Sequence, residues 1–482
     1  MAQSVKTNYI YNVLNTITQM VFPLVSFPYV TRIIGADGLG IIGFCNSFIN
    51  YIILFTCLGI PIYGVREIAR VRENKQNLST TTFELLFLLI TLSLFGYLVV
   101  AILCFTVPQL QSYLNVFLLL SSQVALTTMG LEWFYTGVED FKYITIRAII
   151  IRTIFIVLLF ILVKSQDDLL LYAGLTVAST VGNNVFNIYR LRKYISIKDI
   201  DKIIFKPCRH IKGSLRLFAL NLIKSIYCNL DALMLGLLAS TVAVGYYSST
   251  EKITKMVMGV TTSLSSVMIP RLSNIIRNGD FEEFGRLSKK SLSFTFVISI
   301  PLSVGLIVIA PVLIEVFCGH GFVDAVSTLQ ILSPIIVIIA ISNVLGMQIL
   351  YPQGKENIII LSCAIGALTH VVLNWIFIPI YSQDGAAFST VVSELAVTFS
   401  MYVFGKKFFP CKVFNLGIIK SITASIILFF ICSFVISLDF NIYIELIIVP
   451  LIGFLSYVLF MLICKDEIIN EITLSVINKI RK

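Results

Sequence analysis

The chain has 482 residues, of which 57% are hydrophobic and only 13% are charged, and its formal net charge is +10. A soluble protein of this length needs more polar surface to cover its core, so the composition excludes a soluble globular protein. A helix that crosses a bilayer needs about 20 mostly apolar residues, because about 30 Å of hydrocarbon is covered at about 1.5 Å per residue. Apolar runs of this kind fill the chain, which predicts an all-α polytopic membrane protein.

In chain order, the sequence predicts about fourteen membrane-spanning helices. The first two and the last two apolar runs are the clearest, and only a few polar residues separate the fifth from the sixth. The expected spans are 9–31, 41–63, 82–105, 114–135, 146–164, 169–189, 215–238, 244–268, 291–317, 325–350, 357–380, 384–404, 417–437 and 442–463.

Basic residues are distributed unevenly among the connections between these helices. If the N-terminus is cytoplasmic, the cytoplasmic connections and the two termini hold most of the 36 Lys and Arg residues, and the connection 190–214 is especially rich in them. The outward connections hold almost none, which fits the positive-inside rule. The sequence therefore predicts that both termini are cytoplasmic. Because the loops that set orientation account for the net charge, no nucleic acid is expected as a partner.

Sequence motifs for ATP binding and for metal and redox chemistry are missing. No G-x-x-x-x-G-K-[ST] occurs, and no expected soluble segment is long enough for a nucleotide-binding domain, so ATP is not expected to drive a reaction within this chain. The ten cysteines are scattered, without C-x-x-C or a His/Cys cluster. We expect no cofactor, no metal and no catalytic residue. The first apolar run is too long for a cleavable signal peptide, and none is expected.

Gly38, Gly40 and Gly43 match G-x-G-x-x-G, the fingerprint of dinucleotide binding. That fingerprint needs a preceding strand and an acidic residue about 20 positions further on. Here it follows an expected membrane helix, and residues 48–65 contain no carboxylate. We interpret it as an extracytoplasmic turn whose glycines allow tight packing.

A weak internal repeat relates the two halves of the chain. Leu39-Gly40 begins the second expected helix and Val244-Gly245 begins the eighth, and the basic connections opened by Arg66 and Arg271 recur at the same offset. Parallel repeats of this kind are one plan for a transporter, with the substrate site between the two halves.

Seven segments in register along nearly the whole chain carry a family resemblance. They are "NYIYNVLNTITQMVFPLVSFPYVTRIIGADGLG" (8–40), "GIPIYGVREIARVR" (59–72), "LEWFYTGVEDFKYITIR" (131–147), "LDALMLG" (230–236), "VGYYSSTEKI" (244–253), "MIPRLS" (268–273) and "DGAAFSTVVSEL" (384–395). Together they resemble bacterial oligosaccharide flippases of the Wzx type, which share a superfamily with multidrug-extruding MATE transporters and lipid II flippases.

The resemblance implies two pseudo-symmetric six-helix bundles, in 1–205 and 206–405, followed by two additional helices and a cytoplasmic tail in 406–482. It also implies alternating access and transport of a polyprenyl-diphosphate-linked oligosaccharide, as used for O-antigen, to the outer leaflet of the bacterial cytoplasmic membrane. Membrane lipids would be partners, as would polysaccharide-assembly proteins. The coupling ion, proton or sodium, is left open.

A polar stripe interrupts the expected seventh helix. Asn221, Lys224, Cys228 and Asp231 are spaced three, four and three residues apart, which places them on one face. A Lys or Asp at mid-membrane costs about 2.5–3.5 kcal/mol on insertion scales, so this face is expected to meet protein or water. Lys224 and Asp231 lie about 10.5 Å apart along the axis, too far to satisfy each other. Either Asn221 and Lys224 bind substrate while Asp231 takes part in ion coupling, or these groups pair structurally with other helices.

Further candidates lie in other spans. Arg32, Lys252 and Lys255 are candidates for binding the diphosphate, and Glu251 and Glu394 are candidates for ion coupling. Each has a structural alternative. Arg32 could merely reach the outer interface, the i,i+4 pair Glu251 and Lys255 could neutralise itself, and Glu394 could be a hydrogen-bonded buried carboxylate. Elsewhere, His370 and Asn374 share a face of the eleventh helix, and Arg152, beyond Arg147, is expected to reach the cytoplasmic headgroups.

Two rival functions are compatible with the sequence. A cation-coupled drug extruder shares the fold but would favour acidic cavity groups, whereas cations favour an anionic diphosphate through charge-assisted hydrogen bonds. A membrane-embedded polysaccharide polymerase or glycosyltransferase usually needs a large outward loop, and "SQDDLLLY" (165–172) and "SLDFNIYI" (437–444) are short.

Overall fold

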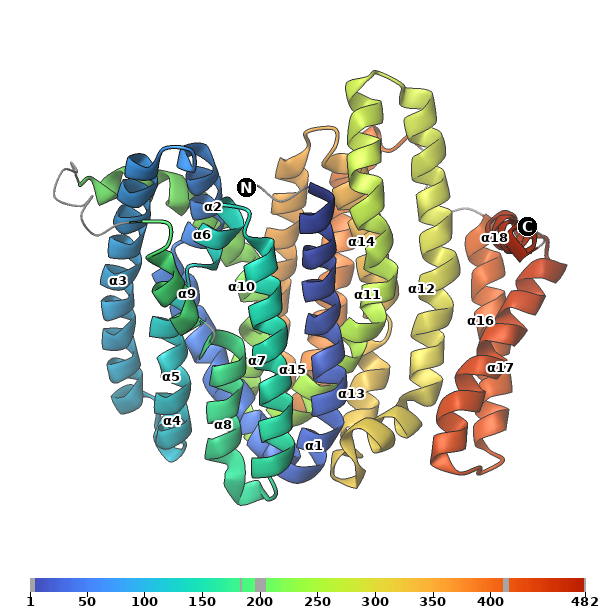
Figure 1. Ribbon diagram of the computed structural model, residues 1–482. Coiled ribbons are helices and arrows are strands. Elements are labelled where there is room, and N and C mark those ends of the chain that lie inside the picture. The colour runs from blue at the N-terminus through green and yellow to red at the C-terminus, as the bar shows by residue number, and fades with distance from the viewer. Residues whose placement is uncertain (1–4, 183, 196–204, 411–415, 481–482) are drawn as a thin grey trace. The chain divides into compact units, whose positions relative to one another are not determined.

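The structure, a computed structural model, describes residues 5–182, 184–195, 205–410 and 416–480, with only the backbone described in some helical stretches (Figure 1). Every regular element in these ranges is a helix, which confirms the predicted all-α fold. Within them, ten helical segments are long and apolar enough to cross a membrane, and Phe22–Val71 and Glu356–Phe408 are long enough to cross twice. With α10 (Ile211–Leu238) and α11 (Thr241–Arg277), these segments account for the predicted spans.

The first compact unit is Met1–Gly245. This unit groups α10 with the N-terminal helices. The division into bundles 1–205, 206–405 and 406–482 is not tested by this grouping and stays a prediction. Besides α10, its α-helices are α1 (Val5–Cys57), α2 (Ile60–Val71), α3 (Lys75–Thr106), α4 (Pro108–Ser112), α5 (Leu114–Thr128), α6 (Glu132–Gly137), α7 (Phe141–Leu162), α8 (Leu169–Val177) and α9 (Asn184–Leu191).

The second compact unit is Tyr246–Lys482. Within it, α16 and α17 lie side by side and pack on α12 (Figure 1). A buried apolar cluster joins the three helices, and the Tyr457 hydroxyl of α17 donates to the Val297 carbonyl of α12 at 2.9 Å. Its α-helices, after most of α11, are α12 (Phe281–Cys318), α13 (Ala325–Leu332), α14 (Ile335–Asn343), α15 (Glu356–Gly405), α16 (Leu416–Ile436), α17 (Ile442–Ile463) and α18 (Glu467–Ile480).

Two of the longest helices are each interrupted at one residue with positive φ. In α1 the break is Gly35, with φ of 75°, and in α15 it is Ser382, with φ of 52°. Two carboxylate contacts hold the second break against α13, because Asp384 accepts hydrogen bonds from Ser327 at 2.8 Å and Thr328 at 2.5 Å. Each interrupted helix therefore supplies two predicted spans.

The two repeat-related glycines contact each other's segment inside the first unit. A Cβ on Gly40 would lie 1.6 Å from the carbonyl oxygen of Thr241, and a Cβ on Gly245 would lie 2.0 Å from that of Ala36. No side chain fits at either position in this packing. The expectation that the glycine motif serves tight packing is confirmed for Gly40, although the backbone break itself lies at Gly35.

A buried hydrogen-bonded chain fixes the start of α10 to α2 and α3. The Glu84 carboxylate, fully inaccessible to solvent, lies 2.9 Å from His210 Nε2 and accepts from an Arg209 guanidinium nitrogen at 2.6 Å. Glu84 also accepts the Lys206 backbone N–H at 2.7 Å. On the far side of the imidazole, His210 Nδ1 lies 2.9 Å from the Tyr63 hydroxyl. The chain thus joins α2, α3 and the N-terminal end of α10, the helix that carries the polar stripe.

Candidate functional site

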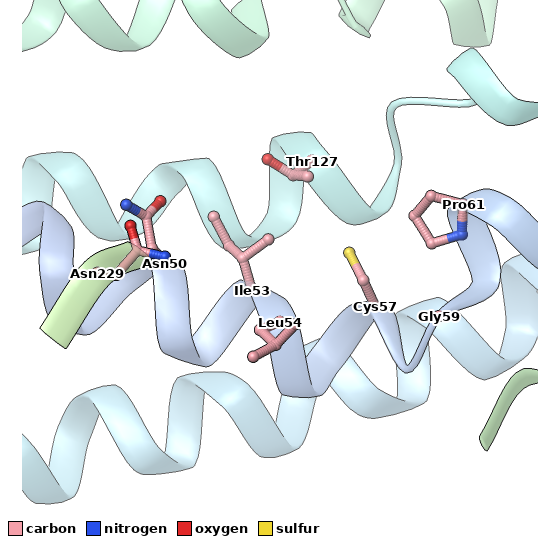
Figure 2. A pocket seen from close by; sticks show the side chains of 8 residues that line it. All are labelled: Asn50, Ile53, Leu54, Cys57, Gly59, Pro61, Thr127 and Asn229. Atoms are coloured by element: carbon pink, nitrogen blue, oxygen red, sulfur yellow. The ribbon is translucent and has the colours of Figure 1, made fainter. Parts of the chain in front are cut away.

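A pocket of about 390 Å³ in the first unit is lined by residues of α1, the start of α2, α5 and α10 (Figure 2). Its polar lining consists of two amides and one hydroxyl, from Asn50 on α1, Asn229 on α10 and Thr127 on α5. The remaining lining is small or apolar and comprises Ile53, Leu54, Cys57, Gly59 and Pro61. The pocket falls within the usual range of small-ligand sites, roughly 300–1,000 Å³.

The polar side chains of α1 and α5 face each other in two successive rungs. In the first rung, the Gln123 amide donates to the Asn46 amide oxygen at 2.8 Å, so these two side chains bond to each other. One helical turn further along both helices, Asn50 and Thr127 form the second rung and line the pocket. Among the residues that the structure describes, neither the Asn50 amide nor the Thr127 hydroxyl has a hydrogen-bond partner, so both are available to a ligand.

The segment 131–147 forms a buried polar network with α9. Arg147, 7% exposed, pairs with Glu132 at 3.0 Å and donates to the Asn187 side chain. The Asn187 amide in turn donates to the Gly130 carbonyl, and the Tyr135 hydroxyl donates to the Asn187 carbonyl at 2.6 Å. Much of segment 131–147, one of the segments that carry the family resemblance, therefore fixes α6, α7 and α9 to one another.

A second cluster completes that network at the end of α9. Asp140 pairs with Arg190 at 2.7 Å and accepts the Tyr194 hydroxyl at 2.7 Å, while the Arg190 guanidinium lies 4.0 Å from the centroid of the Tyr143 ring. Burial, and after it the hydrogen bond to the Asp140 carboxylate, raises the pKa of the Tyr194 phenol. Tyr194 therefore stays protonated at neutral pH and acts here as a donor.

Comparison with known proteins assigns the family. The family model described as "Polysaccharide biosynthesis protein" matches residues 5–276, more than half of the chain. The chain belongs to this family. The model described as MatE matches residues 217–376.

The relatives agree with the family assignment. A protein of Escherichia coli (strain K12) named "Putative O-antigen transporter" is 25% identical over 405 residues, which cover 83% of this chain and 96% of that protein. Among solved structures, the chain is similar to a lipid II flippase MurJ in an inward closed conformation, with a TM-score of 0.70, 17% identity and coverage of 95% and 100%. An inward-facing multidrug resistance MATE transporter gives a TM-score of 0.61, 16% identity and coverage of 84% and 94%. At these identities the two structures show the fold, that of polytopic all-α transporters.

The predicted stripe on α10 is described only in part in this member of the family. The side chains of Asn221, Lys224 and Cys228 lie outside the described part of the structure, so their predicted roles stay predictions. Asp231 is described and is 4% exposed. Asn229, two residues before it on the same helix, lines the pocket and was not predicted from the sequence.

Two charged candidates on α11 form the contact that their i,i+4 spacing predicts. Lys255 and Glu251 form an ion pair at 2.6 Å, which confirms the self-neutralising i,i+4 contact. The neighbouring Lys252 and, on α1, Arg32 are exposed. None of these observations tests a role in substrate binding or ion coupling, which stays a prediction for all four.

The second unit holds a buried polar cluster between the two parts of α15 and α11. His370 Nε2 lies 3.3 Å from the Asn374 amide nitrogen and 3.4 Å from the Thr390 hydroxyl, and that hydroxyl lies 3.0 Å from the Tyr247 hydroxyl. Glu394, one turn beyond Thr390, is 6% exposed. The predicted shared face of His370 and Asn374 is thus confirmed as a contact, and Glu394 is a buried carboxylate near it.

The structure gives partners within the first unit to Arg152, the basic residue expected to reach the cytoplasmic headgroups. Its guanidinium donates to the Asn15 side chain at 3.0 Å and the Thr18 hydroxyl at 2.9 Å, both on α1, and its reach to the headgroups stays a prediction. Hydrogen-bond acceptors on α1 thus satisfy the guanidinium inside the unit. The sequence could not supply these partners, which lie more than a hundred positions earlier.

Proposed function

We propose that this protein is a flippase that moves a polyprenyl-diphosphate-linked oligosaccharide from the cytoplasmic to the outer leaflet by alternating access, for surface polysaccharide biosynthesis. The observation that carries the proposal is the family match over residues 5–276. The relative named as an O-antigen transporter and the fold shared with the MurJ flippase support it. The fold shared with MATE transporters supports drug extrusion only weakly, because it shows the fold alone.

Such a substrate poses a physical problem that a helical cavity can solve. The sugar head and the diphosphate cannot enter hydrocarbon unaided, because their polar groups would lose water without compensation. The polyprenyl chain, in contrast, can remain in lipid. In the proposed cycle, the bundles 1–205 and 206–405 enclose the head, and the helices of 406–482 complete the protein.

Basic side chains are proposed to neutralise the diphosphate. Lys224 is the main candidate, with Asn221 beside it and with Arg32, Lys252 and Lys255 as further contacts. Charge-assisted hydrogen bonds to phosphate strengthen where water is sparse.

Acidic side chains are proposed to couple transport to an ion. Asp231, Glu251 and Glu394 are the candidates, and the ion is a proton or sodium. With no ATP-binding motif in the sequence, flipping in purified liposomes is expected to proceed without ATP. Both termini are proposed to lie in the bacterial cytoplasm, with polysaccharide-assembly proteins and membrane lipids as partners.

The proposal is tested by substitutions at Lys224, read out as polymer at the cell surface and as abundance of the protein in the membrane. Lys224→Ala should abolish export at normal abundance, Lys224→Arg should retain part of it because the charge persists with a different geometry, and Lys224→Glu should be the most defective because it repels the diphosphate. Lys142→Ala, at an exposed lysine of α7, is the matched control and should export normally. Normal export by Lys224→Glu would overturn the binding role, and loss of abundance together with export would favour structural pairing.

A further inference from the structure

The pocket between α1, α5 and α10 differs from the proposed diphosphate site because its lining carries no formal charge. All eight lining residues are neutral, and their polar groups are the side chains of Asn50, Thr127 and Asn229. A phosphate group in a membrane protein calls for cations, and a cationic drug calls for carboxylates. The pocket supplies neither, so its chemistry favours an uncharged polar ligand.

The polar groups of the pocket match the hydrogen-bonding pattern of sugar hydroxyls. A carboxamide both donates and accepts, and so does a hydroxyl, which is also true of each hydroxyl on a pyranose ring. Asn46 and Gln123 use this capacity on each other, at 2.8 Å. Asn50 and Thr127, one turn further on, have no such bond among the described residues, and Asn50 is exposed.

The apolar wall suits the other surface of a sugar. Ile53, Leu54 and Pro61 line the same pocket, and a pyranose presents C–H groups on its ring face that can pack on such side chains. The volume of about 390 Å³ lies near the lower end of the range for small-ligand sites. A site of this size suits a short stretch of glycan and not an entire long oligosaccharide.

We propose that this pocket binds an uncharged sugar of the lipid-linked head group, with hydrogen bonds from Asn50, Thr127 and Asn229. This inference rests on the proposed flippase function and assigns the sugar and the diphosphate to different residues. Selectivity for the glycan then resides in α1, α5 and α10, while the basic residues recognise the diphosphate common to all such substrates.

The test measures binding to the full-length protein in nanodiscs. The probes are undecaprenyl diphosphate alone and undecaprenyl diphosphate bearing a single glucose, galactose or N-acetylglucosamine. Thr127→Val removes the hydroxyl at nearly constant volume, and Asn50→Leu removes the amide. Each should weaken binding of the best sugar-bearing probe by about tenfold, the effect of losing one or two hydrogen bonds, and leave binding of the bare diphosphate unchanged.

Two further variants separate binding from folding. Thr127→Ser keeps the hydroxyl and should retain most of the affinity. Thr128→Val is the matched control, because the Thr128 hydroxyl is buried and bonds back to the Val124 carbonyl at 2.9 Å; it should leave both affinities unchanged.

The outcomes distinguish this inference from the function on which it rests. Equal losses for bare and sugar-bearing probes, unchanged binding in both pocket variants, or a wild type that prefers none of the three sugars over the bare diphosphate would overturn the sugar site. Each of these leaves the flippase proposal standing. A wild type that binds no diphosphate lipid at all would overturn the proposed function, and the sugar site with it.

Discussion

Glu84 is the residue on which the anchoring of α10 depends most directly. Its carboxylate, buried inside the first unit, accepts from the Lys206 backbone and from Arg209 and contacts His210. In Glu84→Gln the side chain keeps its size but loses its charge, and one oxygen acceptor becomes an N–H donor. The new N–H donor would then face at least one group that donates to the carboxylate, either the Lys206 backbone N–H or the Arg209 guanidinium.

The expected cost follows from how deeply each partner is buried. A hydrogen bond to a charged group contributes about 1.5–3 kcal/mol, and breaking a buried pair costs about 3–5 kcal/mol. Arg209 is 52% exposed and can turn to water, whereas His210 is 4% exposed and cannot. We therefore expect Glu84→Gln to destabilise the protein by about 2–4 kcal/mol, through His210 and the Lys206 backbone more than through Arg209.

The assay is thermal unfolding of the purified protein in detergent. Unfolding is measured as the decrease of the monodisperse peak with increasing temperature. The matched control is Glu67→Gln on α2. Glu67 pairs with Arg66 and Arg70 at 3.1 Å each, but these arginines are 52% and 64% exposed, so its loss should cost only about 0–1 kcal/mol. Equal shifts in Glu84→Gln and Glu67→Gln would refute the reasoning.

A double-mutant cycle tests whether the anchor acts as one unit. Tyr63→Phe removes the hydroxyl that contacts His210 on its other nitrogen. If the imidazole links the two sites, Tyr63→Phe and Glu84→Gln should be non-additive by about 0.5 kcal/mol or more. Additive effects would mean that the two contacts stabilise the protein independently.

Three other expectations follow from the structure. Gly40→Ala, which places a Cβ against the Thr241 carbonyl, should lower stability by about 3 kcal/mol or more, whereas Gly305→Ala, with nothing within 4 Å of the added atom, should be neutral or stabilising in the same unfolding assay. Asn187→Leu should cost about 2–4 kcal/mol because it removes a partner of Arg147 and leaves a buried guanidinium short of an acceptor; a neutral result would mean that water replaces the amide. Reporter fusions at the C-terminus should behave as cytoplasmic, and an exported reporter there would contradict the predicted fourteen crossings with both termini in the cytoplasm.

The sequence was sufficient to predict the spans because hydrophobic length is a local property. The first backbone break, at Gly35, falls within the predicted connection 32–40, but it precedes the motif of Gly38, Gly40 and Gly43 that was interpreted as the turn. The glycine motif marks a close approach of two segments, and the partner segment, near Thr241, is not visible in the motif itself.

The polar residues of the pocket and the Glu84 anchor were harder to predict for a physical reason. A charge in an apolar span has a large transfer cost, so it can be recognised in the sequence as a candidate functional residue. Asn50 and Thr127 are uncharged, and only their position across from each other on α1 and α5 distinguishes them from other polar residues. Glu84 carried a usable signal as a carboxylate at the edge of the third span, but its partner His210 lies far along the chain.

The reciprocal contact of Gly40 and Gly245 also limits how this protein can evolve. A clash between two side chains can be relieved by shrinking the partner, so such positions can drift together. Here each missing Cβ is opposed by a backbone carbonyl, at Thr241 and at Ala36, and no substitution removes a carbonyl. The two segments of the first unit therefore restrict both positions to glycine, and no mutation of the partner segment can compensate for a side chain at either one.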